Sequence, residues 1–153
     1  MHIRNSAKAV IHKEGHVLLT KNKDAEGFFY LFPGGGQEHG EVLVDTIKRE
    51  CLEETGYQVA AGDLLYVREY IGKNHEHAHD RDFHQIEFYF VCTIEAGSVE
   101  IPVPTNPDSH QIGIEWVAIS KLPELRMYPK EIGVPIQQFA ENQKAAVYLG
   151  DIN

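Results

Sequence analysis

Cysteine is scarce in this chain of 153 residues, which holds only Cys51 and Cys92. Two cysteines cannot build the disulfide framework of small secreted domains, and nothing in the sequence resembles a secretory signal. No apolar run approaches the roughly 20 residues that a membrane-spanning helix needs. The composition therefore predicts a cytoplasmic protein with no membrane partner.

Positive charge is also scarce, since 14 Lys and Arg residues stand against 23 Asp and Glu residues, for a formal net charge of −9. This balance argues against an extended nucleic-acid surface, because a broad phosphate-binding face needs clustered cations. It allows a small phosphorylated ligand if a bound metal reverses the local field. Hydrophobic residues make up 42% of the chain, so we expect one domain, residues 1–153, with its own core.

The most informative segment spans residues 35–57, in which carboxylates gather at helical spacing. Glu50, Glu53 and Glu54 stand at positions i, i+3 and i+4, so a helix would crowd their like charges onto one surface. A hard divalent cation such as Mg²⁺ prefers oxygen ligands of this kind. A solvated acidic helix face is the plainer interpretation of these three residues alone, so the rest of the segment has to decide.

That segment resembles the Nudix box, G-x5-E-x7-R-E-U-x-E-E-x-G-U, in which U is a bulky apolar residue. The fixed positions are all matched, by Gly35, Glu41, Arg49, Glu50, Glu53, Glu54 and Gly56. Cys51 and Tyr57 depart from the usual aliphatic residues at two U positions, and neither departure removes a ligand. Residues 30–36, before the box, and residues 115–123, after it, are also similar to the family, so the resemblance covers about two thirds of the chain.

The resemblance implies an α/β protein of the Nudix fold, with a mixed β-sheet between helices, and we expect one amphipathic helix from about residue 42 to residue 55. It implies Mg²⁺-dependent hydrolysis of a pyrophosphate bond, with Mn²⁺ as a substitute metal. The metal ligands would be the Gly35 carbonyl and the side chains of Glu50, Glu53 and Glu54. Arg49 would pair with a box glutamate and orient it.

The general base stays open at this point. Glu50 or Glu53 is the favoured choice, and the candidates outside the box are Glu87, Asp108 and Glu115. Many relatives place a glutamate a few residues before the late tryptophan, where this chain has His110, which weakens the case for a distant base. The implied substrate is a nucleoside diphosphate linked to another moiety: a modified dNTP, a dinucleoside polyphosphate or a nucleotide sugar. Its candidate contacts are Arg4, Lys21, Arg68, Tyr70 and Glu87.

Two other functions compete with hydrolysis. A catalytically silent Nudix module that senses or binds a nucleotide would usually have lost box carboxylates, and this chain keeps them. An isomerase of isoprenoid diphosphates on the same fold would need a nucleophilic cysteine. Cys51 and Cys92 both fall at apolar positions of predicted elements, so neither is a good nucleophile. Formation of a homodimer is left open.

Periodicity predicts the remaining elements. We expect strands at residues 7–11, 17–21, 28–32, 64–71, 83–94 and 112–118, and a closing helix at residues 135–149. In the box helix, Val44, Ile47 and Cys51 should face the core, with Gly40 as N-cap and Gly56 as the stop. In the strand at 83–94, Gln85, Glu87 and Tyr89 should share the face opposite the apolar residues.

A polar loop, residues 72–82, separates the two longest predicted strands. Together with His84, its histidines His75, His77 and His79 suggest a transition-metal site at first sight. Their H-x-H-x-H spacing fits no closed zinc motif, and Mg²⁺ chemistry does not call for imidazole ligands. We therefore predict a solvated loop beside the site, with a role in substrate contact left open.

Overall fold

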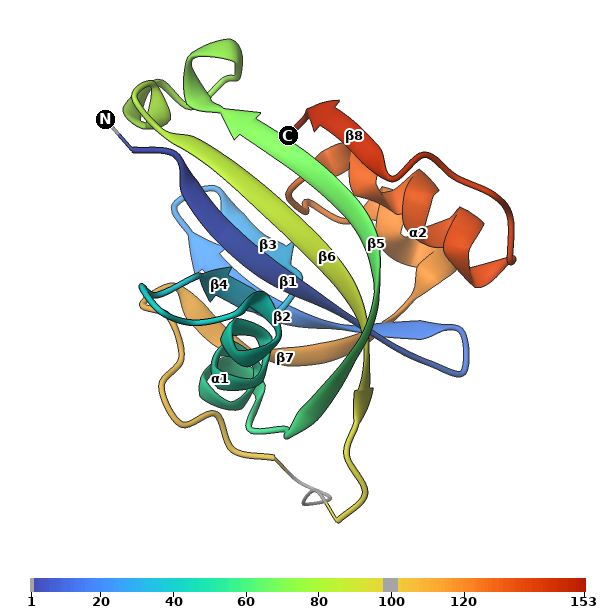
Figure 1. The fold of residues 1–153 in the computed structure, drawn as a ribbon. Helices are drawn as coiled ribbons and strands as arrows, with labels where there is room; N and C mark the ends of the chain where they lie inside the picture. The colour runs from blue at the N-terminus through green and yellow to red at the C-terminus, as the bar shows by residue number, and fades with distance from the viewer. Residues whose placement is uncertain (1, 98–101) are drawn as a thin grey trace.

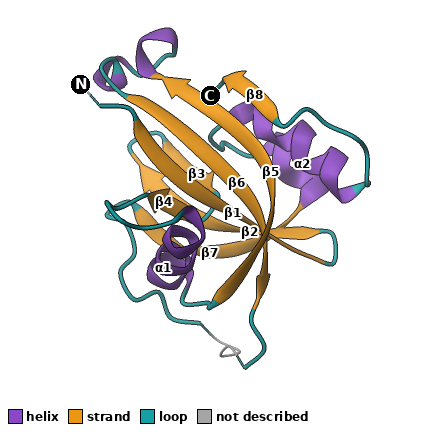
Figure 2. Cartoon of the chain, viewed as in Figure 1, coloured by secondary structure: helices purple, strands orange, loops and turns teal. Residues whose placement is uncertain are grey.

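The computed structural model describes residues 2–97 and 102–153, which form a twisted mixed sheet with a helix on each side (Figures 1 and 2). The helices are α1 (Leu43–Thr55) and α2 (Gly133–Ala140). The strands are β1 (Arg4–Lys13), β2 (His16–Asp24), β3 (Gly27–Leu31), β4 (Gly34–Gly36), β5 (Val59–Ile71), β6 (His84–Ile94), β7 (Gln111–Ala118) and β8 (Tyr148–Asp151). The predicted α/β arrangement of a mixed sheet between helices is confirmed.

The strands run in the order β3-β2-β1-β6-β5-β8, with β4 also paired to β1 and β7 also paired to β2. Strands β1 and β2 form the predicted hairpin, but their registered pairs are confined to His12–Val17 and Lys13–His16. Beyond this end β1 lies between β4 and β6, whereas β2 lies between β3 and β7. The sheet therefore has two halves that diverge from the hairpin.

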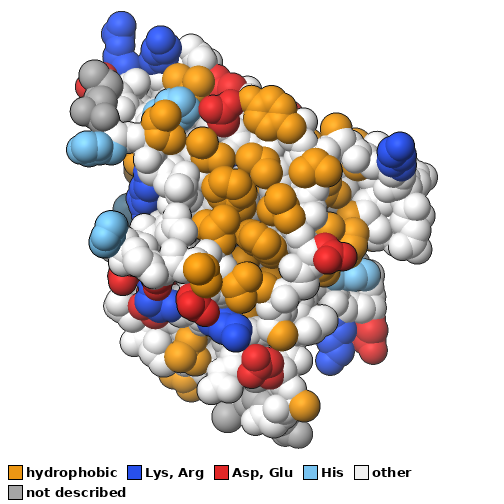
Figure 3. Space-filling model, in the orientation of Figure 1, with side chains coloured by type: hydrophobic (Ala, Val, Ile, Leu, Met, Phe, Trp, Pro, Cys, Tyr) orange, Lys and Arg blue, Asp and Glu red, His pale blue; other side chains and the backbone are white. Residues whose placement is uncertain are grey.

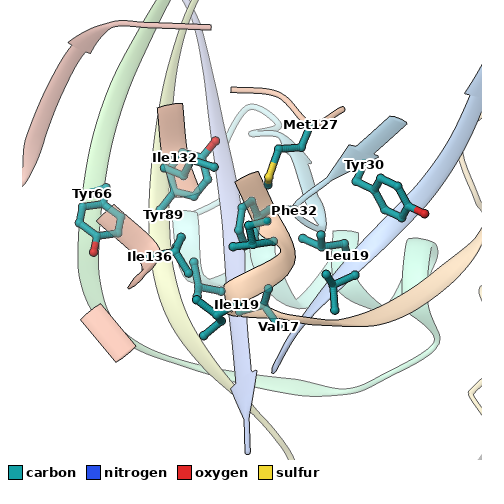
Figure 4. Packing of buried hydrophobic residues seen from close by; sticks show 13 residues of the cluster. Val17, Leu19, Tyr30, Phe32, Tyr66, Tyr89, Ile119, Met127, Ile132 and Ile136 are labelled. Carbon is teal, nitrogen blue, oxygen red and sulfur yellow. The ribbon is translucent and has the colours of Figure 1, made fainter. Parts of the chain in front are cut away.

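Alternation along β1 explains how the two helices cover opposite faces. Ala9 and Ile11 pack in a cluster with Cys51 of α1. Val10, between them in sequence, belongs to a second cluster with Ile136 of α2. Figure 4 shows this second cluster, in which side chains from β2, β3, β5 and β6 meet residues 119–136. One strand thus supplies both cores, as the sandwich requires.

The box helix, Leu43–Thr55, lies where the sequence predicts it, but its N-cap is a different residue. Its N-cap is Val42, not Gly40, which instead has a φ of 87° in the turn before the helix. The prediction that Val44 faces the core is wrong, since 36% of Val44 is exposed. Ile47 and Cys51 are fully buried as predicted, and Gly56 ends the helix in the left-handed conformation with its N–H bonded to the carbonyl of Leu52.

The predicted closing helix at residues 135–149 is also wrong. Helix α2 is shorter and earlier, and Asn142, with a φ of 54°, lies in the left-handed region just after it. The chain then returns as β8, which adds a parallel edge to β5 through pairs such as Val67–Tyr148. Apolar spacing over these residues reflects packing of Ala145 and Leu149 against the second core rather than helical continuity.

Strand β6 alternates as predicted, but its polar face is the more deeply buried one. Gln85, Glu87 and Tyr89 are buried, whereas Ile86 and Phe88 are only half-buried. Figure 3 shows apolar side chains gathered on this outer face of the sheet. No helix within the described ranges is long and apolar enough to cross a membrane.

Candidate functional site

Helix α1 brings two of its carboxylates against the glycine-rich strand β4. Glu54 is only 5% exposed, and its Oε2 accepts a hydrogen bond of 2.9 Å from the Gly34 N–H. The Glu50 carboxylate lies directly over Gly35, because a Cβ added there would fall 2.5 Å from it. Gly34 has a φ of 142° and lies so close to β1 that its own added Cβ would meet the Ala7 carbonyl. Glycine is therefore required here for both backbone shape and space.

Arg49 holds the box carboxylates in a fixed arrangement. Its Nε donates to Glu41 Oε1 at 2.7 Å, its Nη1 donates to Glu50 Oε1 at 2.9 Å, and Nη1 lies 3.5 Å from Glu53 Oε2. Its Nη2 also donates to the Gly36 carbonyl at 3.0 Å. Glu41 also accepts a hydrogen bond from the Thr46 hydroxyl. Charge-assisted bonds of this kind fix orientation as well as adding energy, so Arg49 is placed to orient Glu50 as the family resemblance implies.

The electrostatics of the buried Glu54 and the half-buried Glu50 favour a cation. Burial raises the pKa of Glu54 from its ordinary 4.5 to about 8, against the opposing effects of Lys8 and the Gly34 N–H, while Asp108 and Glu50 raise it further. Burial likewise raises the pKa of Glu50, although Arg49 opposes this. Removing a carboxylate from water disfavours its charged form unless a positive charge is close. A bound divalent ion would supply that charge.

Lys8 and Ser6 on β1 also contribute to the site, and sequence reasoning missed both. Lys8 Nζ donates to the Gly34 carbonyl at 3.4 Å, and its charge lowers the pKa of both Glu50 and Glu54. The Ser6 hydroxyl donates to the Gly35 carbonyl at 2.9 Å. The one sequence signal for them is the alternation of polar and apolar residues along β1, which puts Ser6 and Lys8 on the strand face opposite Ala7 and Ala9.

The loop before β7 closes the C-terminal end of α1. The Asn106 N–H donates to the Glu53 carbonyl at 2.9 Å, and Gln111 Nε2 donates to the Glu54 carbonyl at 2.6 Å. These bonds satisfy carbonyls that a helix end leaves free. They also bring Asp108 close enough for its charge to raise the pKa of Glu54. Among the carboxylates proposed outside the box, Asp108 is thus the one that the structure places beside it.

The donors around Gly35 suit an oxygen-ligated cation. Glu50, Glu54 and the Gly35 carbonyl are all hard oxygen ligands, and a carbonyl that accepts one hydrogen bond keeps a second lone pair. In the described part of the chain, no three His, Cys, Asp or Glu side chains are already gathered as a metal-holding group. Glu53 accounts for this at the box, since its carboxylate turns toward Arg49. Glu50, Glu54 and Gly35 are the best-placed ligands, and Glu53 would have to rotate to join them.

Three of the predicted substrate residues lie together on the sheet. Arg68 Nε donates to Glu87 Oε2 at 2.6 Å, and the hydroxyl of Tyr89 and the amide of Gln85 also donate to Glu87. Burial alone would raise the pKa of Glu87, but the charges of Arg68 and Lys8 outweigh it and lower that pKa. Both Glu87 oxygens are therefore engaged, which argues against Glu87 as a free base. The hydroxyl of Tyr70, two residues after Arg68 on β5, donates to Asp80 Oδ2 at 3.0 Å.

The remaining candidates lie apart from this group. Lys21 stacks its ammonium 4.4 Å from the ring centre of Phe28. Glu115 contacts the Tyr30 hydroxyl and raises the pKa of that phenol, although burial is the larger cause. Arg4 lies over Gly36, where an added Cβ would approach its guanidinium to 2.4 Å, and so flanks the box turn from the outside.

The histidines of the polar loop contact neighbouring segments, and the rings of His77 and His79 also lie 5.6 Å apart. His75 Nε2 lies 2.7 Å from Asp151 Oδ1, and the His75 ring stacks on Tyr70 with centroids 5.2 Å apart. His77 meets the edge of Tyr128 at 5.5 Å. The loop therefore connects β5, β8 and the segment after β7. Most residues of the loop are exposed or half-exposed, as expected of a solvated loop, and these contacts attach it to the neighbouring segments.

The two cysteines are poor nucleophiles. Both are buried and free. Burial raises the pKa of the Cys92 thiol to about 12 and also raises that of Cys51. A reactive cysteine needs a stabilised thiolate, so isomerase chemistry through either residue finds no support.

A cavity of about 570 Å³ lies between the two halves of the sheet. Arg68, Tyr70 and Gln85 line it, as do His77 and His110. A larger cavity of about 820 Å³ opens near the β1–β2 turn and Trp116, and no box carboxylate lines it. No box carboxylate lines the first cavity either, but its wall includes Arg68 and Tyr70, two of the predicted substrate residues, so we take it as the candidate substrate cleft.

Comparison with known proteins identifies the family of the chain. The NUDIX domain model matches residues 2–138. The chain is 29% identical over 119 residues to nucleoside diphosphate-linked moiety X motif 6 of Xenopus laevis, covering 76% of this chain and 50% of that protein. The first curated relatives are longer proteins, and the chain spans about half of their length or less.

Solved structures give the same result for the fold. A NUDIX hydrolase from Nitrosomonas europaea superposes with a TM-score of 0.74 at 17% identity, covering 95% of this chain and 94% of that one. The MutT NUDIX hydrolase from Burkholderia pseudomallei gives 0.65 at 26% identity, covering 88% and 97%. Because the family model spans most of the sequence, this chain belongs to the NUDIX domain family.

Proposed function

We propose that this protein is a Mg²⁺-dependent hydrolase of the pyrophosphate bond in a nucleoside diphosphate linked to another moiety. One observation carries the proposal: the buried Glu54 carboxylate lies against the Gly34 N–H, beside Glu50, with its pKa raised to about 8. A cation would stabilise the charged form of such a pair, and oxygen ligands suit Mg²⁺ or Mn²⁺. Family membership and the name of the Xenopus laevis relative support the substrate class.

The proposed metal ligands are Glu50, Glu54 and the Gly35 carbonyl, joined by Glu53. When bound, the metal would neutralise phosphate oxygens and lower the pKa of a water molecule. Arg49 keeps Glu50 in place through its 2.9 Å bond, while its bonds to Glu41 fix the guanidinium itself. The Lys8 ammonium, beside Gly34, provides a further positive charge for the phosphates.

The proposed general base is Glu50 or Glu53. Burial raises the pKa of Glu50, the direction that suits a base working nearer neutral pH, whereas Glu53 has the more exposed side chain. Separate Glu50→Gln and Glu53→Gln variants distinguish them: the base variant should lose the acidic limb of the kcat profile. The other variant should mainly raise the Mg²⁺ concentration needed for half-maximal rate.

The test of the function is turnover on a panel of nucleotide sugars, dinucleoside polyphosphates and modified dNTPs with Mg²⁺. We expect Glu54→Gln to lower kcat by at least roughly 100-fold, since even residues behind a metal's ligands are worth 10- to 100-fold. Asp45→Asn, an exposed change on the same helix, is the matched control and should retain full turnover. Near-normal turnover by Glu54→Gln would contradict the assignment.

Absence of turnover on the whole panel, with nucleotide binding intact, would instead support a silent binding module. Homodimer formation stays a prediction, which light scattering of the purified protein would test.

A further inference from the structure

The cavity between the two halves of the sheet has walls from segments far apart in the sequence. They come from the β2–β3 turn, from β5 and β6, from the histidine-containing loop, from residues 126–128 and from Asn153. Its volume of about 570 Å³ lies within the range of roughly 300–1,000 Å³ that is usual for small-molecule sites. No motif in the Nudix box predicts this cavity.

The sheet connects this cavity to the carboxylates. Arg68 of the cavity wall stands opposite Glu87, Glu87 stands beside Ser6, and Ser6 stands opposite Gly36. Three strand spacings amount to about 14 Å, a length that a ribose and a diphosphate can span. On the other side the wall ends at His110, next to the Gln111 that bonds to the Glu54 carbonyl.

Charge in the described wall argues against a second phosphate. Both of its guanidinium groups are already paired. Arg68 bonds to Glu87 at 2.6 Å, and Arg126 bonds to both carboxylate oxygens of Asp24 at 2.8 and 2.7 Å. Arg126 also lies 3.1 Å from Glu26. With these carboxylates in the wall, a bound anion would meet net repulsion, so an uncharged group fits better.

The shape and hydrogen bonding of the wall suit a flat group with an acceptor atom. Phe29 presents a half-buried ring that meets Tyr128 edge-on at 6.2 Å and has the Arg126 guanidinium 5.2 Å from its centre, and His77 packs against Tyr128 at 5.5 Å. Asn153 is only 8% exposed, and its buried Nδ2 has no hydrogen-bond partner. A buried donor without a partner is costly, and a ligand acceptor would remove that cost.

We propose that this cavity binds the nucleobase of the substrate, with Phe29 as the stacking surface and Asn153 as a hydrogen-bond donor. The histidine-containing loop then forms one side of the base site, through His77, rather than a metal site. This assignment rests on the proposed function for its substrate class. It makes Phe29 and Asn153 specificity residues that lie outside the Nudix box.

The experiment measures binding of adenosine, guanosine, cytidine and uridine to the metal-free protein by ligand-observed NMR titration. At least one nucleoside should bind, and Phe29→Ala should weaken it about tenfold, as expected for loss of one base–aromatic stack. Asn153→Ala should weaken it severalfold. Phe28→Ala is the matched control, since Phe28 is 49% exposed on the same strand, packs on Lys21 and does not line the cavity.

Failure of this proposal is distinguishable from failure of the proposed function. Nucleosides that do not bind, or that bind equally to wild type and Phe29→Ala, would overturn the base site even if the protein hydrolyses nucleotides. An equal loss in Phe28→Ala would do the same, because it would show a general effect of strand β3. Binding that depends on Phe29 in a protein without turnover would support the site and reject the hydrolase.

Discussion

Arg68 and Glu87 show how a single buried ion pair supports the floor of the cleft. Arg68 is 5% exposed and Glu87 is 4% exposed, and Gln85 and Tyr89 supply further hydrogen bonds to the carboxylate. The Arg68 guanidinium also donates to the Ile152 carbonyl, which ties β5 to the C-terminal segment. Removing one partner would leave a charge enclosed without compensation.

We therefore predict that Glu87→Gln lowers the free energy of unfolding by about 3–5 kcal/mol. The pKa of Glu87 is held below its ordinary value in the folded protein, so its stabilising effect is present above the unfolded pKa near 4.5 and is lost as pH falls through the folded value. Urea unfolding curves should show that the difference in free energy of unfolding between wild type and variant becomes smaller below pH 4.5. Glu124→Gln, in an exposed pair with Lys121, should cost less than about 1 kcal/mol.

At the scale of elements, strand β4 and helix α1 form one unit, because Gly35 of β4 lies against Glu50 of α1. Gly35→Ala would place a methyl group 2.5 Å from the Glu50 carboxyl group. The end of a glutamate side chain moves readily, so the fold should survive while the carboxylate is displaced. We predict a rise of 10- to 100-fold in the Mg²⁺ concentration for half-maximal rate, with a melting temperature close to wild type.

Gly113→Ala is the control for that change, since nothing lies within 4 Å of its added Cβ. It should leave the Mg²⁺ dependence of the rate within about twofold of wild type, because strand β7 tolerates the methyl group. An unchanged Mg²⁺ dependence in Gly35→Ala would show that Glu50 is not a ligand.

Sequence reasoning succeeded where structure is local and failed where it depends on distant pairing. The motif located α1 and its stop at Gly56, because helix ends are set by neighbouring residues. The closing helix was wrong because Tyr148 pairs with β5, a contact that apolar spacing does not reveal. Alternation gave the two faces of β6, but the burial of its polar face depends on Arg68 from another strand.

The same limit applies to the site. The box carboxylates and Arg49 were predictable because seven fixed positions in one segment carry them. Lys8 and Gln111 were not, since each reaches the box only through tertiary contacts. The cavity wall comes from segments between Asp24 and Asn153, and although Arg68 and Tyr70 were predicted as substrate contacts, no motif showed that these segments meet.

For the whole molecule, the buried Glu54 carboxyl group makes the free energy of unfolding depend on both metal and pH. In metal-free protein the pKa of Glu54 is raised to about 8. A raised carboxyl pKa means that the folded state holds a proton that the unfolded state has released, so stability falls as pH rises from 4.5 through 8. Metal binding requires the deprotonated carboxylate, and its stabilising effect should grow over the same interval.

We predict that Mg²⁺ at about ten times its Kd stabilises the protein by about 1.4 kcal/mol, a rise in Tm of roughly 3–6 °C for a domain of this size. The rise should be larger at pH 8 than at pH 6, and scanning fluorimetry in Mg²⁺ against EDTA would measure it. Glu54→Gln should show no rise at either pH and, in EDTA, a flatter dependence of Tm on pH than wild type, because glutamine has no proton to lose. Equal Mg²⁺ shifts in wild type and Glu54→Gln would place the metal elsewhere and remove Glu54 from the site.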